Sequence, residues 1–340
     1  MRYILYFFIG FVATALIYIS QVFLLFPTPV SAEYWVREML VMKRNIGREF
    51  AGHKKIVLAG GSSVLFGLDS NEVGQALGLP AINFGLMAGL PLDTVLRETA
   101  AVVGDGDILV LALEQDYYCR EANRGYDEWQ IRNAIAWDYQ YWQEMTSFER
   151  LASLRFMSPL FPLEMIKARI DLWMGSPIVQ PRLAALDDAQ VLSKYANPPA
   201  TADNLYSIYN IDRLGNIRNS DEASYNGQPY SRADVEIQIC DGTFLKIKKF
   251  VEGMRSKRIS VFFMNPPFMA LPDLNPAKID ESDEAFIKKL SSLAPVLDRK
   301  SEILVPRDNF LNSDMHLNSK GRAFRTKLLI ERLNKAIPLS

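Results

Sequence analysis

The chain begins with an apolar segment. Between Tyr3 and Phe26 there is no charged side chain, and the clearly polar residues are Thr14, Ser20 and Gln21. As a helix, the 24 residues of this segment would extend over roughly 36 Å at about 1.5 Å per residue, enough to cross a hydrocarbon core of ~30 Å. We therefore predict that residues 1–32 form a transmembrane anchor.

Two properties of this anchor have alternative interpretations. Val30-Ser31-Ala32 resembles the processing site of a cleaved signal peptide, although the apolar core of such a peptide is usually only about 7–15 residues long. Arg2 lies on one side of the segment, and Arg37, Lys43 and Arg44 lie on the other. This distribution favours a cytoplasmic domain, but long domains are translocated largely regardless of flanking charge. The charge rule therefore leaves the orientation open.

Mixed apolar and charged residues at 33–52 predict a short amphipathic stalk. From residue 53 onwards, short apolar runs alternate with segments of helical periodicity. The predicted strands are Lys55–Ala59, Ala81–Phe84, Asp107–Leu113, Ile259–Met264 and Glu302–Val305. The predicted helices are Ser70–Leu77, Leu92–Val103, 244–254, 283–293 and 320–334. This alternation predicts a three-layer α/β/α domain over 53–336, with a mostly parallel sheet and helices on both of its faces.

Residues 120–235 interrupt the alternation. They are rich in Trp, Tyr, Asn and Asp, with helical patterns at 127–145 and 159–174 and no strong buried strand. We interpret this region as an insertion that forms a lid or a side subdomain. Its aromatic side chains are suited either to stacking on sugars or to packing in the core of an amphipathic helix. They are Trp129, Trp137, Tyr139, Tyr141 and Trp142.

Candidate chemistry lies at the ends of the predicted strands, because ligands of parallel α/β sheets bind at the carboxyl ends of the strands. The first strand ends in Gly60-Gly61-Ser62-Ser63, and the loop 306–318 contains Asp314 and His316. The only other histidine, His53, precedes the first strand, at the opposite end of the sheet.

A serine hydroxyl becomes a good nucleophile when a base removes its proton, and that base is commonly a histidine oriented by a carboxylate. We predict that Ser63 is the nucleophile, His316 the general base and Asp314 the residue that orients it. The alternative for Ser62 and Ser63 is a role as turn or N-cap residues, and His316 taken alone fits a structural role. A phosphate-binding P-loop is disfavoured, because no lysine follows the glycines.

Composition narrows the class of protein. The chain is 49% hydrophobic and 23% charged, which is typical of a folded domain and excludes global disorder. A formal net charge of −1 gives no support to nucleic-acid binding. Cys119 and Cys240 lie far apart in the sequence and make no metal-binding pair. We favour two buried thiols over a disulfide, and we expect neither a metal nor a cofactor.

Three short motifs resemble the blocks of the SGNH/GDSL hydrolase superfamily. The segment 61–67, Gly-Ser-Ser-Val-Leu-Phe-Gly, resembles the first block, Gly-Asp-Ser-x-x-x-Gly, with Ser63 at the nucleophile. The segment 83–89, beginning Asn83-Phe84-Gly85 and ending at Gly89, resembles the second block, whose glycine supplies an oxyanion N–H. The segment 316–321, His-Leu-Asn-x-x-Gly, resembles the last block, His-Pro-Asn-x-x-Gly. The resemblance covers about 55–118 and 243–335, and it implies the SGNH fold.

The chain departs from the superfamily pattern at several positions. The usual aspartate position, three residues before the histidine, is Ser313, whereas Asp314 lies two residues before it. Gly85 and Gly89 compete for the second-block role. The third block, with its asparagine donor, is missing, and the resemblance leaves Gln115 or Tyr117 as substitutes.

The resemblance is to membrane-anchored members such as alginate O-acetylation proteins and the D-alanyl transfer protein of teichoic acids. It implies a serine acyltransferase or acyl esterase acting on a cell-envelope polymer or exopolysaccharide through an acyl-serine intermediate. It further implies a single-pass protein of the bacterial inner membrane with a periplasmic domain, and a multi-spanning membrane acyltransferase as the donor partner. The alternative is a non-catalytic SGNH-like binding or assembly protein of a polysaccharide export or modification complex.

Overall fold

The computed structural model divides the chain into two compact units. Unit 1 comprises Met1–Arg37 and Tyr126–Val191, and unit 2 comprises Glu38–Gly125 and Leu192–Ser340. The structure describes residues 2–25, 34–119, 128–158, 160–177, 187–197, 205–218, 220–221 and 225–337. The division shows that the middle region predicted as one insertion at 120–235 contributes to both units.

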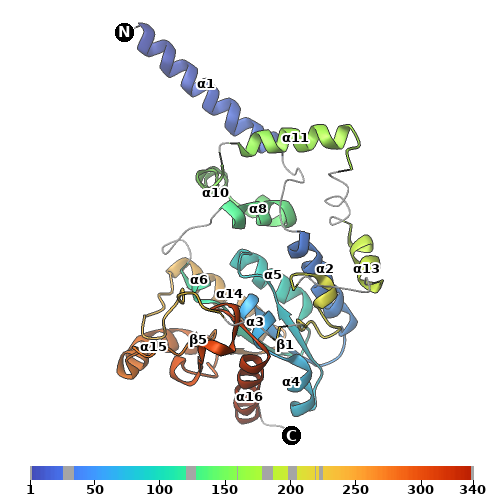
Figure 1. Cartoon of the computed structure of the whole chain (residues 1–340), viewed down its shortest axis with the longest axis vertical. Helices are drawn as coiled ribbons and strands as arrows, with labels where there is room; N and C mark the ends of the chain where they lie inside the picture. Colours follow the sequence, from blue (N-terminus) through green and yellow to red (C-terminus); the bar gives the residue numbers. More distant parts are fainter. Residues whose placement is uncertain are drawn as a thin grey trace. The chain divides into compact units, whose positions relative to one another are not determined.

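Unit 1 is helical in its described part (Figure 1). Its elements are α1 (Arg2–Leu25), α8 (Glu128–Trp137), α9 (Tyr139–Glu144), α10 (Ser147–Ser153), the 3-10 helix η1 (Leu154–Phe156) and α11 (Phe161–Trp173). Helix α1 is long and apolar enough to cross a membrane, over Arg2–Ser20. Phe26 and the processing-site resemblance at 30–32 lie outside the described residues.

A small apolar cluster joins the helices of unit 1. Ile131 of α8, Trp142 of α9 and Phe161 and Met165 of α11 are buried together with Met157. Of the aromatic side chains proposed for sugar stacking, three are buried and one is half-buried, which fits their alternative role in packing. The buried ones are Trp137, Tyr141 and Trp142, and the half-buried one is Trp129. The Tyr139 side chain lies outside the described part.

Unit 2 contains a parallel sheet of four strands in the order β2-β1-β3-β4. The strands are β1 (Ile56–Gly60), β2 (Ala81–Gly85), β3 (Ile108–Ala112) and β4 (Ser260–Phe263). Every residue of β1, β2 and β3 is buried, as expected for strands that are covered on both faces. The mixed α/β class and the parallel sheet are thereby confirmed.

The helices of unit 2 follow the predicted order. They are α2 (Tyr34–Glu49, from Glu38 onwards), α3 (Ser62–Gly67), α4 (Ser70–Leu77), α5 (Leu92–Val102), α6 (Gln115–Tyr118), α13 (Asp188–Ala196, from Leu192 onwards), η2 (Ile208–Asn210), α14 (Asp241–Ser256), α15 (Pro276–Ser291), η3 (Lys300–Glu302), η4 (Arg307–Asn309) and α16 (Ser319–Ala336). The strand predicted at Glu302–Val305 shortens to β6 (Leu304–Val305). It pairs with β5 (Phe268–Met269) and not with the four-stranded sheet. A hairpin of β7 (Phe310–Ser313) and β8 (His316–Leu317) precedes α16.

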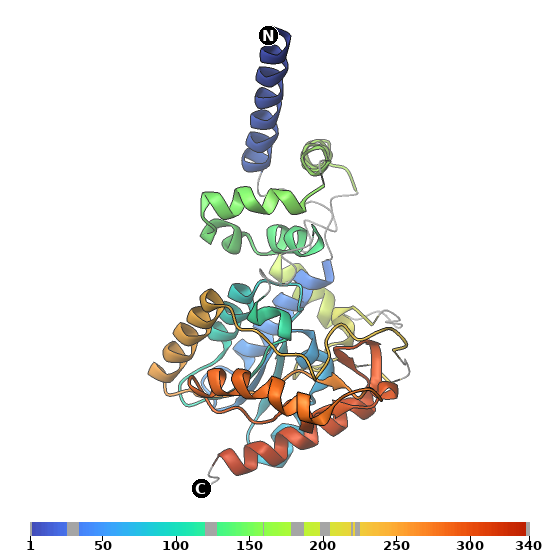
Figure 2. The same cartoon turned by 90° about the vertical axis from the view of Figure 1, so that its left-hand side faces the viewer.

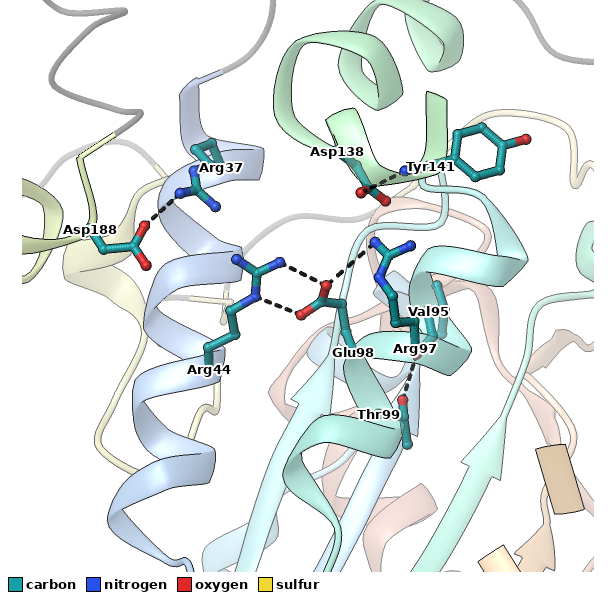
Figure 3. Close-up of polar contacts among 9 residues, drawn as sticks. All are labelled: Arg37, Arg44, Val95, Arg97, Glu98, Thr99, Asp138, Tyr141 and Asp188. Carbon is teal, nitrogen blue, oxygen red and sulfur yellow. Dashed lines mark hydrogen bonds and ion pairs between the residues drawn. The ribbon is translucent and has the colours of Figure 1, made fainter. Parts of the chain in front are cut away.

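The segment predicted as a stalk at 33–52 is largely the helix α2, and the part from Glu38 onwards belongs to unit 2. Met39, Leu40 and Met42 are buried. The guanidinium of Arg44 donates two hydrogen bonds of 2.6 and 2.7 Å to the carboxylate of Glu98 on α5 (Figure 3). This part of the chain therefore packs in the folded body.

Lys43 also fixes α2 to unit 2. Its ammonium group is fully buried and donates 2.6 Å hydrogen bonds to the carbonyls of Asn83 on β2 and Gly215. Burial lowers the pKa of Lys43 to about 7, although Asp212 opposes this shift. Lys43 therefore links α2 to the sheet by hydrogen bonds, although its burial disfavours the charged form of the side chain.

Cys119 and Cys240 form a disulfide in unit 2. The prediction of two buried thiols is therefore wrong. The two residues are 121 positions apart in the sequence, but their Cα atoms lie only 4.9 Å apart, within the usual range for a disulfide. The chain leaves the sheet after β3, and the residue before α14 returns to the same place. Sequence distance gave no sign of this proximity.

Candidate functional site

The turn after β1 approaches the neighbouring strands closely. A Cβ atom at Gly60 would lie 2.0 Å from the carbonyl oxygen of Ala112 at the end of β3, and one at Gly85 would lie 2.2 Å from the amide nitrogen of Leu65 in α3. Side chains at these two positions would therefore force the backbones apart. The glycines allow α3 to begin directly at the carboxyl end of the sheet, where chemistry was predicted.

The two serines that begin α3 differ in their surroundings. Ser63 is fully buried, and its hydroxyl is enclosed without a hydrogen-bond partner. Its backbone N–H donates a 2.7 Å hydrogen bond to Oε1 of Glu114, the second residue after β3. Ser62 keeps 7% of its surface exposed, so it is the residue of the pair that solvent reaches. The structure records no acceptor for the Ser62 N–H among the residues that it describes.

His316 lies on the same side of α3 as the serine pair. Its ring stacks on Phe66, with ring centroids 4.2 Å apart and planes inclined by 22°. Phe66 is four residues after Ser62, and residues at this spacing share one face of a helix. Helix α3 therefore joins the predicted nucleophile region to the predicted base, although the Ser63 hydroxyl makes no hydrogen bond to the imidazole.

Asn312 holds the imidazole in one tautomer. Nδ1 of His316 lies 2.8 Å from Oδ1 of Asn312, and Nδ2 of Asn312 donates a 2.8 Å hydrogen bond to the hydroxyl oxygen of Tyr206. Because an amide oxygen only accepts hydrogen bonds, Nδ1 of His316 carries the proton. Nε2 of the neutral ring therefore keeps a free lone pair, as a general base requires.

Burial lowers the pKa of His316 to about 4. Among the described residues, the recorded contacts of the ring are with Phe66, Tyr206 and Asn312, which carry no negative charge. The positive form of the imidazole is consequently disfavoured. The ring is neutral throughout the physiological pH range.

Asp314, predicted to orient His316, has another partner. One of its carboxylate oxygens accepts a hydrogen bond from the backbone N–H of Tyr230. The hydrogen bond that the structure records for His316 goes to Asn312. The hairpin of β7 and β8 changes register between Phe310 and Ser313, and this irregularity accompanies the pairing of His316 with the residue four positions before it.

The predicted oxyanion donors fall into two groups. The Gly85 N–H donates to Oδ1 of Asn83 at 2.9 Å, and the Asn83 amide nitrogen donates to the carbonyls of α3 and the residue that follows it. The Tyr117 hydroxyl donates to the carbonyl of Met87 at 3.2 Å. In the described residues, no partner is recorded for the amide nitrogen of Gln115 or for the Gly89 N–H. The Gly89 N–H is thus the predicted donor left for a ligand, whereas the Gln115 amide nitrogen is enclosed in the same way as the Ser63 hydroxyl.

A buried charged cluster lies beneath this turn. Glu114 lies against Gly61, where a Cβ atom would be 2.3 Å from its carboxylate. Arg325 of α16 is buried between the charges of Asp298 and Glu114, and its Nη2 donates to the carbonyl of Asn265. Burial raises the pKa of Asp298 to about 7 and lowers that of Arg325 to about 10.

Sequence reasoning missed Ser62 as the accessible serine, and also Asn312 and the cluster around Arg325. Asn312 is not a carboxylate and lies four residues before His316, so the superfamily spacing gave no signal for it. The one available signal for Glu114 and Asn265 was their position directly after the predicted strands Asp107–Leu113 and Ile259–Met264. Within the described ranges, no group of three or more His, Cys, Asp and Glu residues is arranged to hold a metal ion.

Comparison with known proteins identifies no relative: no protein-family model matches this chain, and no curated protein matches it.

Proposed function

We propose that this protein is a membrane-anchored serine acyltransferase or acyl esterase that works through an acyl-serine intermediate. The observation that carries the proposal is the hydrogen-bonded pair of His316 and Asn312. It supplies a neutral imidazole with a free Nε2 lone pair beside the helix that begins with two serines. This is the reaction class that a serine, a histidine and an orienting side chain perform together.

Ser62 is the nucleophile in this proposal. A substrate must reach the reacting hydroxyl, and of the two serines only Ser62 retains exposure to solvent. Ser62 also lies one helical turn before Phe66, on which His316 stacks. The role predicted for Ser63 is therefore transferred to its neighbour, and Ser63 is assigned to the packing beneath it.

The proposed chemistry proceeds in two steps. Nε2 of His316 accepts the proton of the Ser62 hydroxyl while its oxygen attacks the acyl carbonyl carbon. The developing oxyanion is stabilised by N–H donors, for which the backbone amides of Ser62 and Gly89 are suited. The imidazolium then gives its proton to the leaving alcohol, and an acyl-serine remains. Water or a sugar hydroxyl takes the acyl group in the second step.

The proposed location is the periplasmic face of a bacterial inner membrane. Helix α1 is long and apolar enough to serve as the anchor, and disulfides such as Cys119–Cys240 persist in oxidising compartments outside the cytoplasm. The domain is proposed to have the three-layer SGNH arrangement with residues 120–235 as an insertion. Its proposed substrates are esters of a cell-envelope polymer or exopolysaccharide, with a multi-spanning membrane acyltransferase as the acyl donor.

Labelling with a fluorophosphonate tests the catalytic proposal. The full chain in detergent should form a covalent adduct at Ser62. The variants Ser62→Ala and His316→Ala should lose the adduct, whereas Ser63→Ala should keep most of it. An unlabelled wild-type chain that is folded by circular dichroism would contradict the proposal. Labelling that persists in Ser62→Ala and disappears in Ser63→Ala would return the nucleophile to Ser63.

A second candidate function is a non-catalytic binding or assembly role in a polysaccharide export or modification complex. It is favoured by the hydrogen bond from the Ser63 N–H to Glu114 and by that from the Gly85 N–H to Asn83. Both N–H groups would serve as oxyanion donors in the superfamily pattern, and both are already occupied. A folded chain that binds an acetylated polysaccharide but never reacts with a phosphonate would support this candidate.

A further inference from the structure

Helix α11 carries apolar side chains on two faces. Phe161 and Met165 on its inner face belong to the buried cluster of unit 1. On this side Arg132 of α8 pairs with Glu164, with nitrogen–oxygen distances of 2.5 and 3.0 Å. The inner face is therefore fully accounted for by packing within the unit.

The outer face of α11 is apolar but exposed. Its side chains have exposed fractions between 47% and 87% and belong to Leu160, Leu163, Ile170, Trp173 and Met174. At 100° per residue these positions fall within one stripe along the helix, interrupted by the charge of Lys167. Contiguous exposed apolar surface of this kind marks a site of protein or membrane interaction.

The contact between α11 and α1 indicates what covers the exposed apolar face of α11. Within unit 1, α11 packs against α1 (Figures 1 and 2). The Tyr18 hydroxyl donates to the carbonyl of Ser158, three residues before α11, at 3.4 Å. Tyr18 also packs against the buried cluster beneath α11. The N-terminal end of α11 therefore lies beside Tyr18 of α1, and most side chains of α1 before Tyr18 are exposed.

The length of α1 places the membrane boundary at the same level. The apolar segment from Tyr3 to Phe26 would extend over roughly 36 Å as a helix, which is longer than a hydrocarbon core of ~30 Å. The membrane boundary therefore falls within the last turns of this segment. Tyr18 lies on this part of α1, belongs to a residue type that is enriched at membrane interfaces, and contacts Ser158.

We propose that α11 lies in the membrane interface, with its outer stripe among the headgroups and upper acyl chains of the leaflet from which α1 emerges. The proposal rests on α1 being a membrane anchor, as stated in the proposed function, and is independent of the serine chemistry. Trp173 is suited to this position because its ring is amphipathic. The Lys167 ammonium group, which interrupts the stripe, donates a 2.7 Å hydrogen bond to the carboxylate of Asp171 on the same helix, so its charge is paired.

Bromolipid quenching tests the proposal. The full chain is reconstituted at low density into vesicles of phosphatidylcholine and phosphatidylglycerol whose acyl chains carry bromine, and tryptophan is excited selectively. Helix α1 contains no tryptophan, and Trp35, Trp137 and Trp142 are buried. We expect Trp173→Phe to lose most of the bromolipid-dependent quenching, whereas the control Trp129→Phe, at a half-buried position, retains it.

Two outcomes would overturn the proposal. If Trp173 is quenched by aqueous acrylamide and not by bromolipid, the stripe faces water. If Trp173 is shielded from both quenchers, another protein surface, most simply a second copy of the chain, covers it. Flotation of the same vesicles separates these results from a failure of the anchor, because α1 should keep every variant with the lipid. Phosphonate labelling reports separately on the catalytic proposal.

Discussion

Oδ1 of Asn312 lies 2.8 Å from Nδ1 of His316, four residues further along the chain. The amide oxygen fixes the proton on Nδ1, so the lone pair of the neutral imidazole is on Nε2. A neutral side chain thus takes the orienting position for which a carboxylate was predicted. The charge of the side chain at position 312 should affect the pKa of His316 and therefore the pH dependence of the reaction, which can be measured.

Two replacements of Asn312 should distinguish the effect of orienting the imidazole of His316 from the effect of a negative charge beside it. Asn312→Ala removes the acceptor for Nδ1, and we expect the rate of phosphonate labelling to fall by about tenfold or more, part of the 10²–10⁴ that a positioned base contributes. Asn312→Asp keeps an acceptor and should retain labelling. Its negative charge should raise the pKa of His316, which a histidine NMR titration would detect. Equal labelling rates in the three proteins would contradict the orienting role.

The pH dependence of labelling should have its acid limb near pH 4. His316 acts as a base only when it is neutral, and its pKa is lowered to about 4 by burial. Labelling should therefore remain constant as the pH falls through 6.5, the ordinary histidine value, and decline only near 4. Asn312→Asp should shift this limb to higher pH. A wild-type limb at 6–7 would show that the ring is solvated in the working site.

Lys43 should make the stability of the protein rise with pH. The unfolded chain holds the lysine proton up to about pH 10.5, whereas the folded chain releases it near pH 7. Between these values unfolding takes up a proton, so the free energy of unfolding increases with pH, by at most about 1.4 kcal/mol per pH unit. Chemical denaturation from pH 6 to 10 should show this slope in wild type and in the control Lys54→Met, an exposed position. Lys43→Met should lose the slope just above pH 7 and have a smaller slope at higher pH, where Lys300, whose pKa burial lowers to about 8, still contributes.

Arg325 should be essential for stability, because it offsets the buried charges of Asp298 and Glu114. Arg325→Met removes the nearby positive charge and leaves the buried carbonyl of Asn265 without its donor, and an unsatisfied buried polar group typically costs about 1–3 kcal/mol. The exposed Lys327 on the same helix provides the matched control, Lys327→Met, which should be nearly neutral. The measurement is the denaturant midpoint of each variant. Similar midpoints for both variants would show that the cluster contributes no net stability.

The disulfide should contribute strongly to folding. It closes a loop of 121 residues, for which the restriction of the unfolded chain is worth about 5 kcal/mol. The double variant Cys119→Ser/Cys240→Ser should unfold at a clearly lower denaturant concentration than wild type. Wild type treated with a thiol reductant should approach the same midpoint. If reduction leaves the midpoint unchanged, the bond does not restrict the unfolded chain.

The hydrophobic pattern predicts the four-stranded sheet well, because its strands are continuous apolar runs that end in glycine or polar residues. The predicted Ala81–Phe84 differs from β2 by one residue at one end, and Asp107–Leu113 differs from β3 by one residue at each end. Helix α4 agrees at both ends, because Asp69 caps its N-terminus and Gly78 ends it in the left-handed conformation. These signals are local, so a single sequence contains them.

Features that depend on distant contacts could not be predicted in the same way. The pairing of β6 with β5, the burial of Lys43 and the disulfide each join residues that are tens of positions apart or more. The ring of His316 bonds to Asn312 and not to Asp314, in a hairpin whose register changes between Phe310 and Ser313. Sequence spacing therefore located the loop that carries His316, but it did not predict which neighbour the ring would face.

The position of Lys43 also affects whether a strand of another chain can pair with the edge of the sheet. Strand β2 is the last strand of the sheet on its side, and Asn83 directs both of its backbone groups away from β1. Its carbonyl accepts from Lys43, and its N–H donates to the carbonyl of Leu214 at 2.8 Å. These are the groups that an incoming strand would need for pairing. Because both groups are already bonded, a strand of another chain cannot pair with β2 at Asn83, and this protects the edge of the sheet from aggregation.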